Sequence, residues 1–307
     1  MVGGQGSKLA RAIAVTHGLR PAKITELRGM GSVNHVFIVD TDTSRCVIRF
    51  AIDPLRQNDF QVESWALAQA AMHGIPSPGV VAEGLHREVP YLVQTFVDGV
   101  SGTERRSPNL WRTLGEYART VHAIPVSADA PEGLFSRFGR NLPAAWEAHL
   151  GYNLDQLVPA DPLISLGAYR SHEQPRLRDA ITQLRSTEWK FGLNHGDLSP
   201  RNLLVPPRDK PVLIDWGSAC AGPVPFNDLL PLAKAHQIED NPSARDLDAF
   251  ADGYGISLEV GDTLEHLLLL SALDLVRWAI EQRPDLVSEV VASARRVFAQ
   301  QKQVGTS

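Results

Sequence analysis

One stretch near the middle of the 307-residue chain carries side chains that could act on phosphate. Asp197, preceded by His195 and Gly196, is followed five positions later by Asn202, and Asp215 comes after a further short segment. In phosphoryl transfer, one carboxylate orients the acceptor hydroxyl, while an amide oxygen and a second carboxylate hold the magnesium ions that bridge the nucleotide phosphates. These residue types in this order therefore predict phosphoryl transfer.

The elements around this stretch predict how its side chains come together. The short apolar runs Leu203–Val205 and Val212–Ile214 flank a proline-rich segment that is typical of a turn. Two strands folded back at this turn would place Asn202, before the first strand, beside Asp215, after the second. One metal ion could then contact both residues, and Asp197 would face the same cleft from the acceptor side.

The two motifs, His195-Gly-Asp197 with Asn202 and Ile214-Asp-Trp-Gly217, resemble those of the aminoglycoside phosphotransferase family, a branch of the protein-kinase-like fold. The resemblance implies an α+β, bilobal fold. A small N-terminal lobe with an antiparallel sheet and a helix would span residues 1–97 and end in a hinge. A larger, mainly helical C-terminal lobe that carries the catalytic and acceptor sites would span residues 98–307.

The resemblance also implies an enzyme that moves the γ-phosphate of ATP, with GTP as an alternative, to a hydroxyl group of a small molecule. Asp197 would be the catalytic residue, and Asn202 and Asp215 would bind Mg²⁺. An aminoglycoside or another antibiotic is one hypothesis for the acceptor, with antibiotic resistance as the consequence. A choline-like alcohol, homoserine or a sugar is the alternative.

A glycine-rich segment upstream predicts the phosphate-binding loop. Its pattern, Gly29-x-Gly31-x-x-Asn34-x-Val36, matches the kinase loop except that Asn34 replaces the third glycine. Glycine lets main-chain N–H groups approach phosphates closely. We therefore expect Gly29, Gly31, Ser32 and Asn34 to contact the nucleotide.

Arg49 lies in the next predicted strand, where kinase-like folds place a lysine. The resemblance implies that Arg49 binds the α- and β-phosphates and pairs with Glu63 on a helix predicted over residues 57–73. Asp59, one turn earlier, is an alternative partner, and Arg49 as a surface strand residue is the alternative interpretation. Thr95 and Val97, before the hinge, are the expected main-chain contacts of adenine.

Two further classes of protein are alternatives to a small-molecule kinase. A protein kinase is disfavoured because Gly196 and Ser199 replace the arginine and lysine of that class, and no Ala-Pro-Glu follows Asp215. A catalytically inactive nucleotide-binding protein is suggested only by Asn34 and Arg49.

The composition of the chain limits the classes of partner that the protein can bind. The net charge of −5 argues against nucleic acid, which requires a basic face. Two cysteines are too few for a disulfide framework. Residues 3–8 predict a flexible terminus and lack the apolar core of a signal peptide. Residues 267–280 form an apolar segment that is too short to span a bilayer. We therefore expect a cytoplasmic protein with no membrane contact. Acidic residues between 239 and 252 favour a solvated helix face, with attraction of a cationic substrate as the alternative. The oligomeric state is left open.

Overall fold

The computed structural model describes residues 3–27, 34–53, 56–105, 107–208, 210–239, 241–256 and 262–300. The chain forms two compact units. Unit 1 consists of Met1–Phe135, Gly192–Ala221 and Arg245–Gly255, and unit 2 consists of Ser136–Phe191, Gly222–Ala244 and Ile256–Ser307. These units are defined by their compactness, whereas the boundary predicted after residue 97 is a hinge between two lobes. The hinge therefore stays a prediction.

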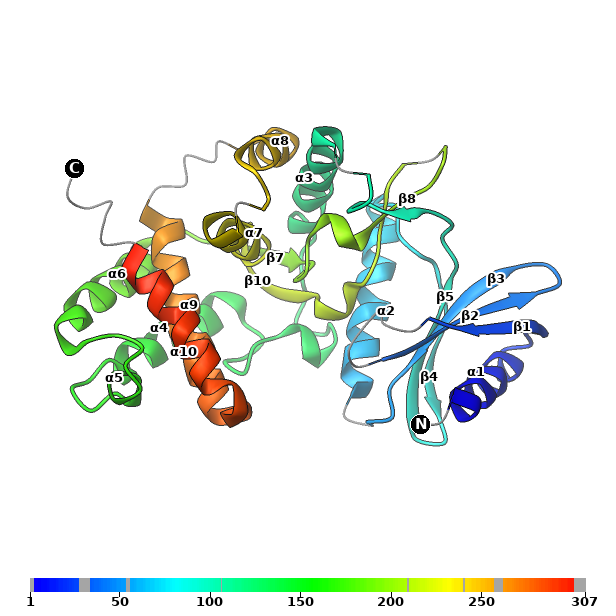
Figure 1. The fold of residues 1–307 in the computed structure, drawn as a ribbon, viewed down its shortest axis with the longest axis horizontal. Coiled ribbons are helices and arrows are strands. Elements are labelled where there is room, and N and C mark those ends of the chain that lie inside the picture. Colours follow the sequence, from blue (N-terminus) through cyan, green and yellow to red (C-terminus); the bar gives the residue numbers. More distant parts are fainter. Residues whose placement is uncertain are drawn as a thin grey trace. The chain divides into compact units, whose positions relative to one another are not determined.

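Unit 1 contains a five-stranded antiparallel sheet in the order β1-β2-β3-β5-β4 (Figure 1). In β3, buried residues alternate with exposed or partly exposed ones, as expected for a strand of a sheet with one covered face. Their bounds are β1 (Pro21–Glu26), β2 (His35–Thr41), β3 (Arg45–Phe50), β4 (Val80–His86) and β5 (Val89–Thr95).

Helix α1 (Gly3–Thr16) packs against this sheet, mainly on β1 and β2 (Figure 1). Its buried residues Ala10 and Ile13 share a core with Phe37 and Ile48. The prediction of a flexible terminus at residues 3–8 is therefore wrong. Gly6 explains the difference, because an added Cβ would lie 2.8 Å from the Phe37 ring, so glycine here serves close packing.

Helix α2 (Gln57–Met72) follows the predicted bounds and ends before Gly74, which has a φ of +73°. It packs against β4, β5 and the 3-10 turn Trp216–Ser218. Helix α2 therefore connects the sheet to the segment that follows Asp215.

The rest of unit 1 is built around the central motif. β6 (Val100–Ser101), β8 (Leu203–Val205) and β9 (Val212–Leu213) form a small antiparallel sheet. Helix α3 (Pro108–His122) begins at Ser107, whose side chain accepts a hydrogen bond from the Leu110 N–H at 3.3 Å. The remaining elements are α8 (Ala244–Tyr254), β7 (Lys190–Asn194) and β10 (Cys220–Val224), of which β7 and β10 run across the boundary between the units.

Unit 2 is helical. Helix α9 (Asp262–Gln282) packs against α6 (Gln174–Ser186), α7 (Phe226–Glu239) and α10 (Val287–Gln300) around a leucine-rich core. Helix α4 (Leu142–Gln156) has 15 residues. Its N-terminus is fixed by Asn141, which accepts a hydrogen bond from the Ala144 N–H at 3.2 Å. The short helix α5 (Pro162–Ser165) completes the unit.

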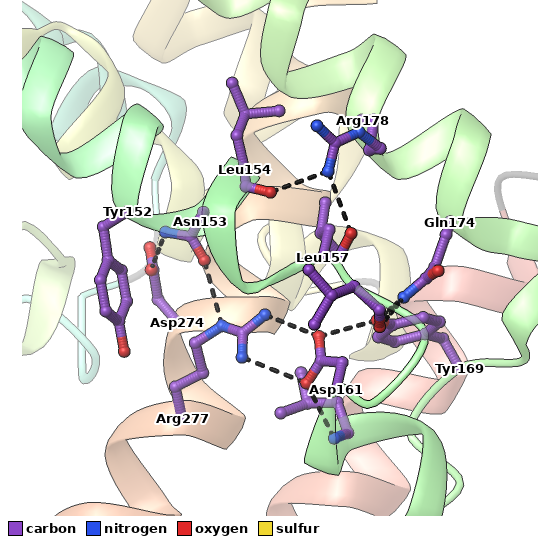
Figure 2. A network of polar contacts seen from close by, with 12 residues as sticks. Tyr152, Asn153, Leu154, Leu157, Asp161, Tyr169, Gln174, Arg178, Asp274 and Arg277 are labelled. Carbon is purple, nitrogen blue, oxygen red and sulfur yellow. Dashed lines mark hydrogen bonds and ion pairs between the residues drawn. The ribbon is translucent and has the colours of Figure 1, made fainter.

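A buried ion pair stabilises unit 2. Asp161 and Arg277 are 1% and 6% exposed, and the Arg277 guanidinium binds both carboxylate oxygens, at 3.3 and 2.9 Å. The Tyr169 hydroxyl and the Leu163 N–H also donate to Asp161, at 2.7 and 3.0 Å. Figure 2 shows Arg277 between Asp161 and Asn153, which extends the network. The buried carboxylate is therefore fully hydrogen-bonded, as a buried charge requires.

The element content matches the predicted α+β class, with an antiparallel sheet and its helices followed by a mainly helical region. Within the described ranges, no helix combines the length and apolar character needed to cross a membrane.

Candidate active site

The hairpin predicted after Asn202 is present. β8 and β9 pair antiparallel, with Leu203 opposite Leu213. One step beyond this pair, the Ile214 N–H donates to the Asn202 carbonyl at 2.9 Å. Because Asp215 directly follows Ile214, the main chain holds Asn202 next to Asp215, as the spacing predicted.

His195 attaches the loop before Asp197 to the same hairpin. The imidazole is fully buried, with Nε2 3.0 Å from the Ile214 carbonyl and Nδ1 3.3 Å from the Asp197 N–H. These contacts select the tautomer in which Nε2 carries the proton and donates to the carbonyl, while Nδ1 accepts. The ring also packs against Trp216, with centroids 4.7 Å apart. His195 therefore positions the loop that carries Asp197.

Gly196 is required by the backbone of this loop. Its φ is +79°, and an added Cβ would lie 1.9 Å from the Ser218 carbonyl oxygen. Both the conformation and the close approach exclude a side chain. The loop before Asp197 therefore packs directly on the turn after Asp215.

Two side chains hold the Asp197 carboxylate. The Asn202 amide donates to the Asp197 carbonyl at 2.7 Å and to Oδ2 at 2.9 Å. The Nη2 group of Arg201 donates to Oδ1 at 2.5 Å and to Oδ2 at 2.7 Å. The Asp197 side chain remains 31% exposed. The predicted catalytic carboxylate is thus fixed in orientation and still accessible to an acceptor.

Sequence reasoning did not identify Arg201. The available signal was its spacing, four residues after Asp197 on a turn that Pro200 begins. A 3-10 turn over Pro200–Asn202 folds the chain back, so that a long side chain at its second position can reach Asp197. Its hydrogen bonds to Asp197 raise the pKa of Arg201, so the guanidinium is permanently charged.

Arg49 connects the sheet to the loop after β9. Its Nη1 group binds Glu63, and its Nη2 group lies 3.1 Å from Asp215 Oδ1. The predicted pair of Arg49 with Glu63 is therefore present, while Asp59 pairs with Arg56 at 2.9 Å. The Arg49 side chain is 15% exposed, which rules out the interpretation as a surface strand residue.

The Arg49–Glu63 pair lies in a buried environment. Burial lowers the pKa of Arg49, but the charges of Glu63 and Asp215 outweigh burial and leave it raised. Burial also raises the pKa of Glu63, against the opposing effect of Arg49. Gln94 on β5, which the sequence analysis did not single out, donates to Glu63 at 3.0 Å. Arg49 is therefore a fixed cation that bridges two carboxylates.

The donor set near the hairpin suits a hard cation. The Asn202 amide nitrogen is used by Asp197, and among the described residues its Oδ1 accepts no hydrogen bond. The Asp215 carboxylate is 48% exposed, and its backbone adopts the left-handed conformation, with φ 63° and ψ 59°. Mg²⁺ prefers oxygen ligands and commonly takes one or two from protein and others from phosphates. The described residues contain no cluster of three or more His, Cys, Asp or Glu that could hold a metal, so phosphates would have to complete this site.

The predicted nucleotide contacts can be placed only in part. Gly29, Gly31 and Ser32 lie outside the described residues. Asn34 precedes β2, and its Oδ1 is buried without a hydrogen-bond partner among the described residues. Thr95 ends β5, and its hydroxyl accepts the Gly79 N–H at 2.8 Å, so its side chain serves the turn before β4. Val97 follows β5 and is partly exposed. Their contacts with a nucleotide stay predictions.

The fold is shared with known phosphotransferases. The macrolide 2'-phosphotransferase MphH from Brachybacterium faecium is 19% identical, with a TM-score of 0.63, and the match covers 94% of this chain and 97% of that chain. The spectinomycin phosphotransferase APH(9)-Ia, solved with ADP and spectinomycin, is 16% identical, with a TM-score of 0.57 and coverage of 95% and 93%. The GDP and kanamycin complex of APH(2")-IIia is 15% identical, with a TM-score of 0.63 and coverage of 95% and 99%. These matches define a protein-kinase-like fold, as predicted.

The sequence gives the family. The model of the phosphotransferase enzyme family matches residues 23–267, and the chain belongs to that family. No curated protein sequence matches the chain at a significant level. Membership makes the chain a small-molecule phosphotransferase that binds a nucleotide and uses an alcohol group as acceptor, which confirms the resemblance drawn from its two motifs.

Proposed function

We propose that the protein transfers the γ-phosphate of ATP or GTP to a hydroxyl group of a small molecule, with Asp197 as the catalytic residue and Asn202 and Asp215 as Mg²⁺ ligands. One observation carries this proposal. Asn202 binds Asp197 with its side chain and Ile214 with its main chain, so the acceptor carboxylate and the metal donors form one connected group.

The geometry suggests how these residues act. Asp197, oriented by Asn202 and Arg201, accepts a hydrogen bond from the acceptor hydroxyl and takes its proton late in the reaction. The acceptor oxygen bonds to the γ-phosphorus as the bond to the β–γ bridging oxygen breaks, and the nucleoside diphosphate leaves. Arg49 neutralises phosphate charge. Mg²⁺, when bound at Asn202 and Asp215, supplies charge neutralisation of the nucleotide phosphates.

The nucleotide and acceptor contacts belong to the same proposal. Gly29, Gly31, Ser32 and Asn34 would contact the phosphates, and the main chain at Thr95 and Val97 would contact adenine. Spectinomycin and kanamycin are bound in two of the similar structures, which supports an antibiotic as one acceptor hypothesis. A metabolic alcohol such as choline, homoserine or a sugar is the other.

The test is magnesium-dependent consumption of ATP and GTP against a panel of hydroxylated antibiotics and metabolic alcohols. Asp197→Asn is the blank, because it keeps the side-chain shape but removes the charge that holds the acceptor proton. We expect this variant to bind nucleotide with near wild-type affinity and to lose nearly all transfer, by roughly 10²- to 10⁴-fold. Transfer at more than a few per cent of wild type would contradict the assignment of Asp197.

A further inference from the structure

Arg201 occupies a special position on the acceptor side of the candidate site. It lies in the 3-10 turn that begins at Pro200, and one of its nitrogens, Nη2, binds both oxygens of Asp197. Its side chain is 64% exposed. Arg201 therefore reaches from the solvent side onto the carboxylate that the proposed function assigns to the acceptor hydroxyl.

Most of the donors of Arg201 are unused by the described residues. Its Nε and Nη1 groups make no hydrogen bond within the described part of the chain, and only Nη2 is engaged. A guanidinium has five N–H donors, and the two on Nη1, beside the engaged Nη2, remain available to an anionic oxygen. Arg201 can thus bind Asp197 and a second anion together.

The Asp197 carboxylate can also accept a further hydrogen bond. Its Oδ2 accepts from Asn202 and Arg201, whereas its Oδ1 accepts a side-chain hydrogen bond only from Arg201 among the described residues. A carboxylate oxygen can accept two hydrogen bonds. Oδ1 is therefore the oxygen that can receive an acceptor hydroxyl, directly beside the Arg201 guanidinium.

The charges of the site make Arg201 different from Arg49. Both nitrogens at the end of Arg49 are engaged, one with Glu63 and one with Asp215. Arg201 shares one carboxylate and presents the rest of its guanidinium to solvent. An acceptor bound at Asp197 therefore lies beside free guanidinium N–H groups, from which an anionic oxygen can accept hydrogen bonds and an ammonium group cannot.

We propose that Arg201 determines acceptor specificity by binding, through the N–H groups of Nη1, an anionic oxygen group on the molecule whose hydroxyl faces Asp197. This inference rests on the proposed function and narrows its acceptor. The acceptor class is a hydroxylated carboxylate or a phosphorylated alcohol, and polycationic aminocyclitols are disfavoured.

The test compares acceptor pairs that differ by one anionic group: gluconate with sorbitol, glycerate with glycerol, and glucose 6-phosphate with glucose, with kanamycin as the polycation. Wild type, Arg201→Met and Arg201→Lys are assayed for kcat and KM. Arg112→Met is the matched control, because Arg112 is also exposed and pairs with Asp252. Binding of each acceptor to the full chain with Mg²⁺ and ADP is measured by calorimetry, so that the result does not depend on turnover.

We expect wild type to prefer the anionic member of at least one pair, either the carboxylate or the phosphate. For that member, Arg201→Met should weaken binding roughly 10- to 100-fold, the range expected for lost charged hydrogen bonds. The neutral member should change much less, and Arg201→Lys should give an intermediate value. If Arg201 had a purely structural role, Arg201→Met would weaken the binding of both members of the pair equally.

The proposal is overturned if no anionic probe binds better than its neutral partner, if Arg201→Met affects both alike, or if kanamycin is the best acceptor. These outcomes are distinct from failure of the proposed function. That failure would appear as no magnesium-dependent nucleotide turnover with any acceptor, whereas the calorimetric comparison still decides the role of Arg201.

Discussion

Arg49 on β3 and Asp215 after β9 form an ion pair at 3.1 Å, although 166 positions separate them in the chain. The same guanidinium binds Glu63 on α2. A planar fork can bind two carboxylates at defined angles, whereas the ammonium of lysine is a point charge. Arginine at this position therefore couples the β3 strand, the α2 helix and the candidate metal loop within unit 1.

This relationship predicts the effect of Arg49→Lys. A lysine could bind Glu63 or Asp215 but not both at once, as arginine does. We therefore expect the KM for the nucleotide to rise roughly tenfold, as the loss of one charged hydrogen bond implies. Steady-state kinetics at saturating magnesium would measure it. Arg45→Lys, on the same strand and paired with Asp40, is the control. Unchanged nucleotide kinetics in Arg49→Lys would show that the fork is not needed.

The buried Glu63 predicts a pH dependence of stability. Burial raises the pKa of Glu63, and Arg49 opposes that shift. In Arg49→Ala the pKa should therefore rise further. A carboxyl whose folded pKa is raised contributes stability below its unfolded pKa and loses it as pH rises through the folded value. The variant should lose stability relative to wild type as the pH rises from near the pKa of an unperturbed glutamate, about 4.3, into the mildly alkaline range.

Urea unfolding at the two ends of this pH range would measure the effect. The double variant Arg49→Ala with Glu63→Gln removes the titrating group, so the difference in stability between the single and the double variant should carry the pH dependence of Glu63. An equal pH dependence in the single and double variants would mean that Glu63 is not its source.

Asp215 allows charge and conformation to be separated. Its φ of 63° is left-handed, a region that asparagine tolerates and alanine does not. We expect Asp215→Asn to keep wild-type stability and to require at least about tenfold more magnesium for half-maximal activity, which corresponds to roughly 1.4 kcal/mol. Asp215→Ala should add a stability loss of about 1 kcal/mol from backbone strain.

Magnesium titrations of nucleotide consumption, together with unfolding midpoints, would test both variants. An unchanged magnesium requirement in Asp215→Asn would remove Asp215 from the metal site. Equal stability of the two variants would argue against strain at this position.

The network of Figure 2 predicts a large stability effect in unit 2. Asp161→Ala would leave the buried Arg277 without its carboxylate, and breaking such a pair costs about 3–5 kcal/mol. Asp285→Ala is the control, because Asp285 pairs with Arg283 at the surface and its loss should change little. Denaturant unfolding of both variants would measure the contrast. Similar small losses in both would show that the buried pair contributes little.

The parts of the site that local patterns determine were predictable. The hairpin follows from two apolar runs and the prolines between them, and it fixes where Asn202 lies relative to Asp215. The Arg49–Glu63 pair was expected from the family resemblance, which implies an ion pair between this strand and the next helix. In each case, the chemistry of the motif and the local elements gave the same answer.

Features that depend on tertiary packing were not predictable. Arg201 in a loop reads as a solvated side chain, and only the return of the turn after Pro200 brings it onto Asp197. The glycines near the N-terminus suggested flexibility, whereas the contact of Gly6 with Phe37 makes them part of a packed helix. Asp161 and Arg277 lie 116 positions apart, and no periodicity connects them.

The tight contact of Gly196 with Ser218 also has a consequence for regulation. Protein kinases place an arginine at the equivalent of Gly196, where it senses phosphorylation of the activation loop. Here a side chain at that position would collide with the Ser218 carbonyl and would need an unfavourable φ. No single substitution can therefore add that sensor without rebuilding both loops. The backbone of this loop thus excludes the arginine through which protein kinases respond to phosphorylation of the activation loop.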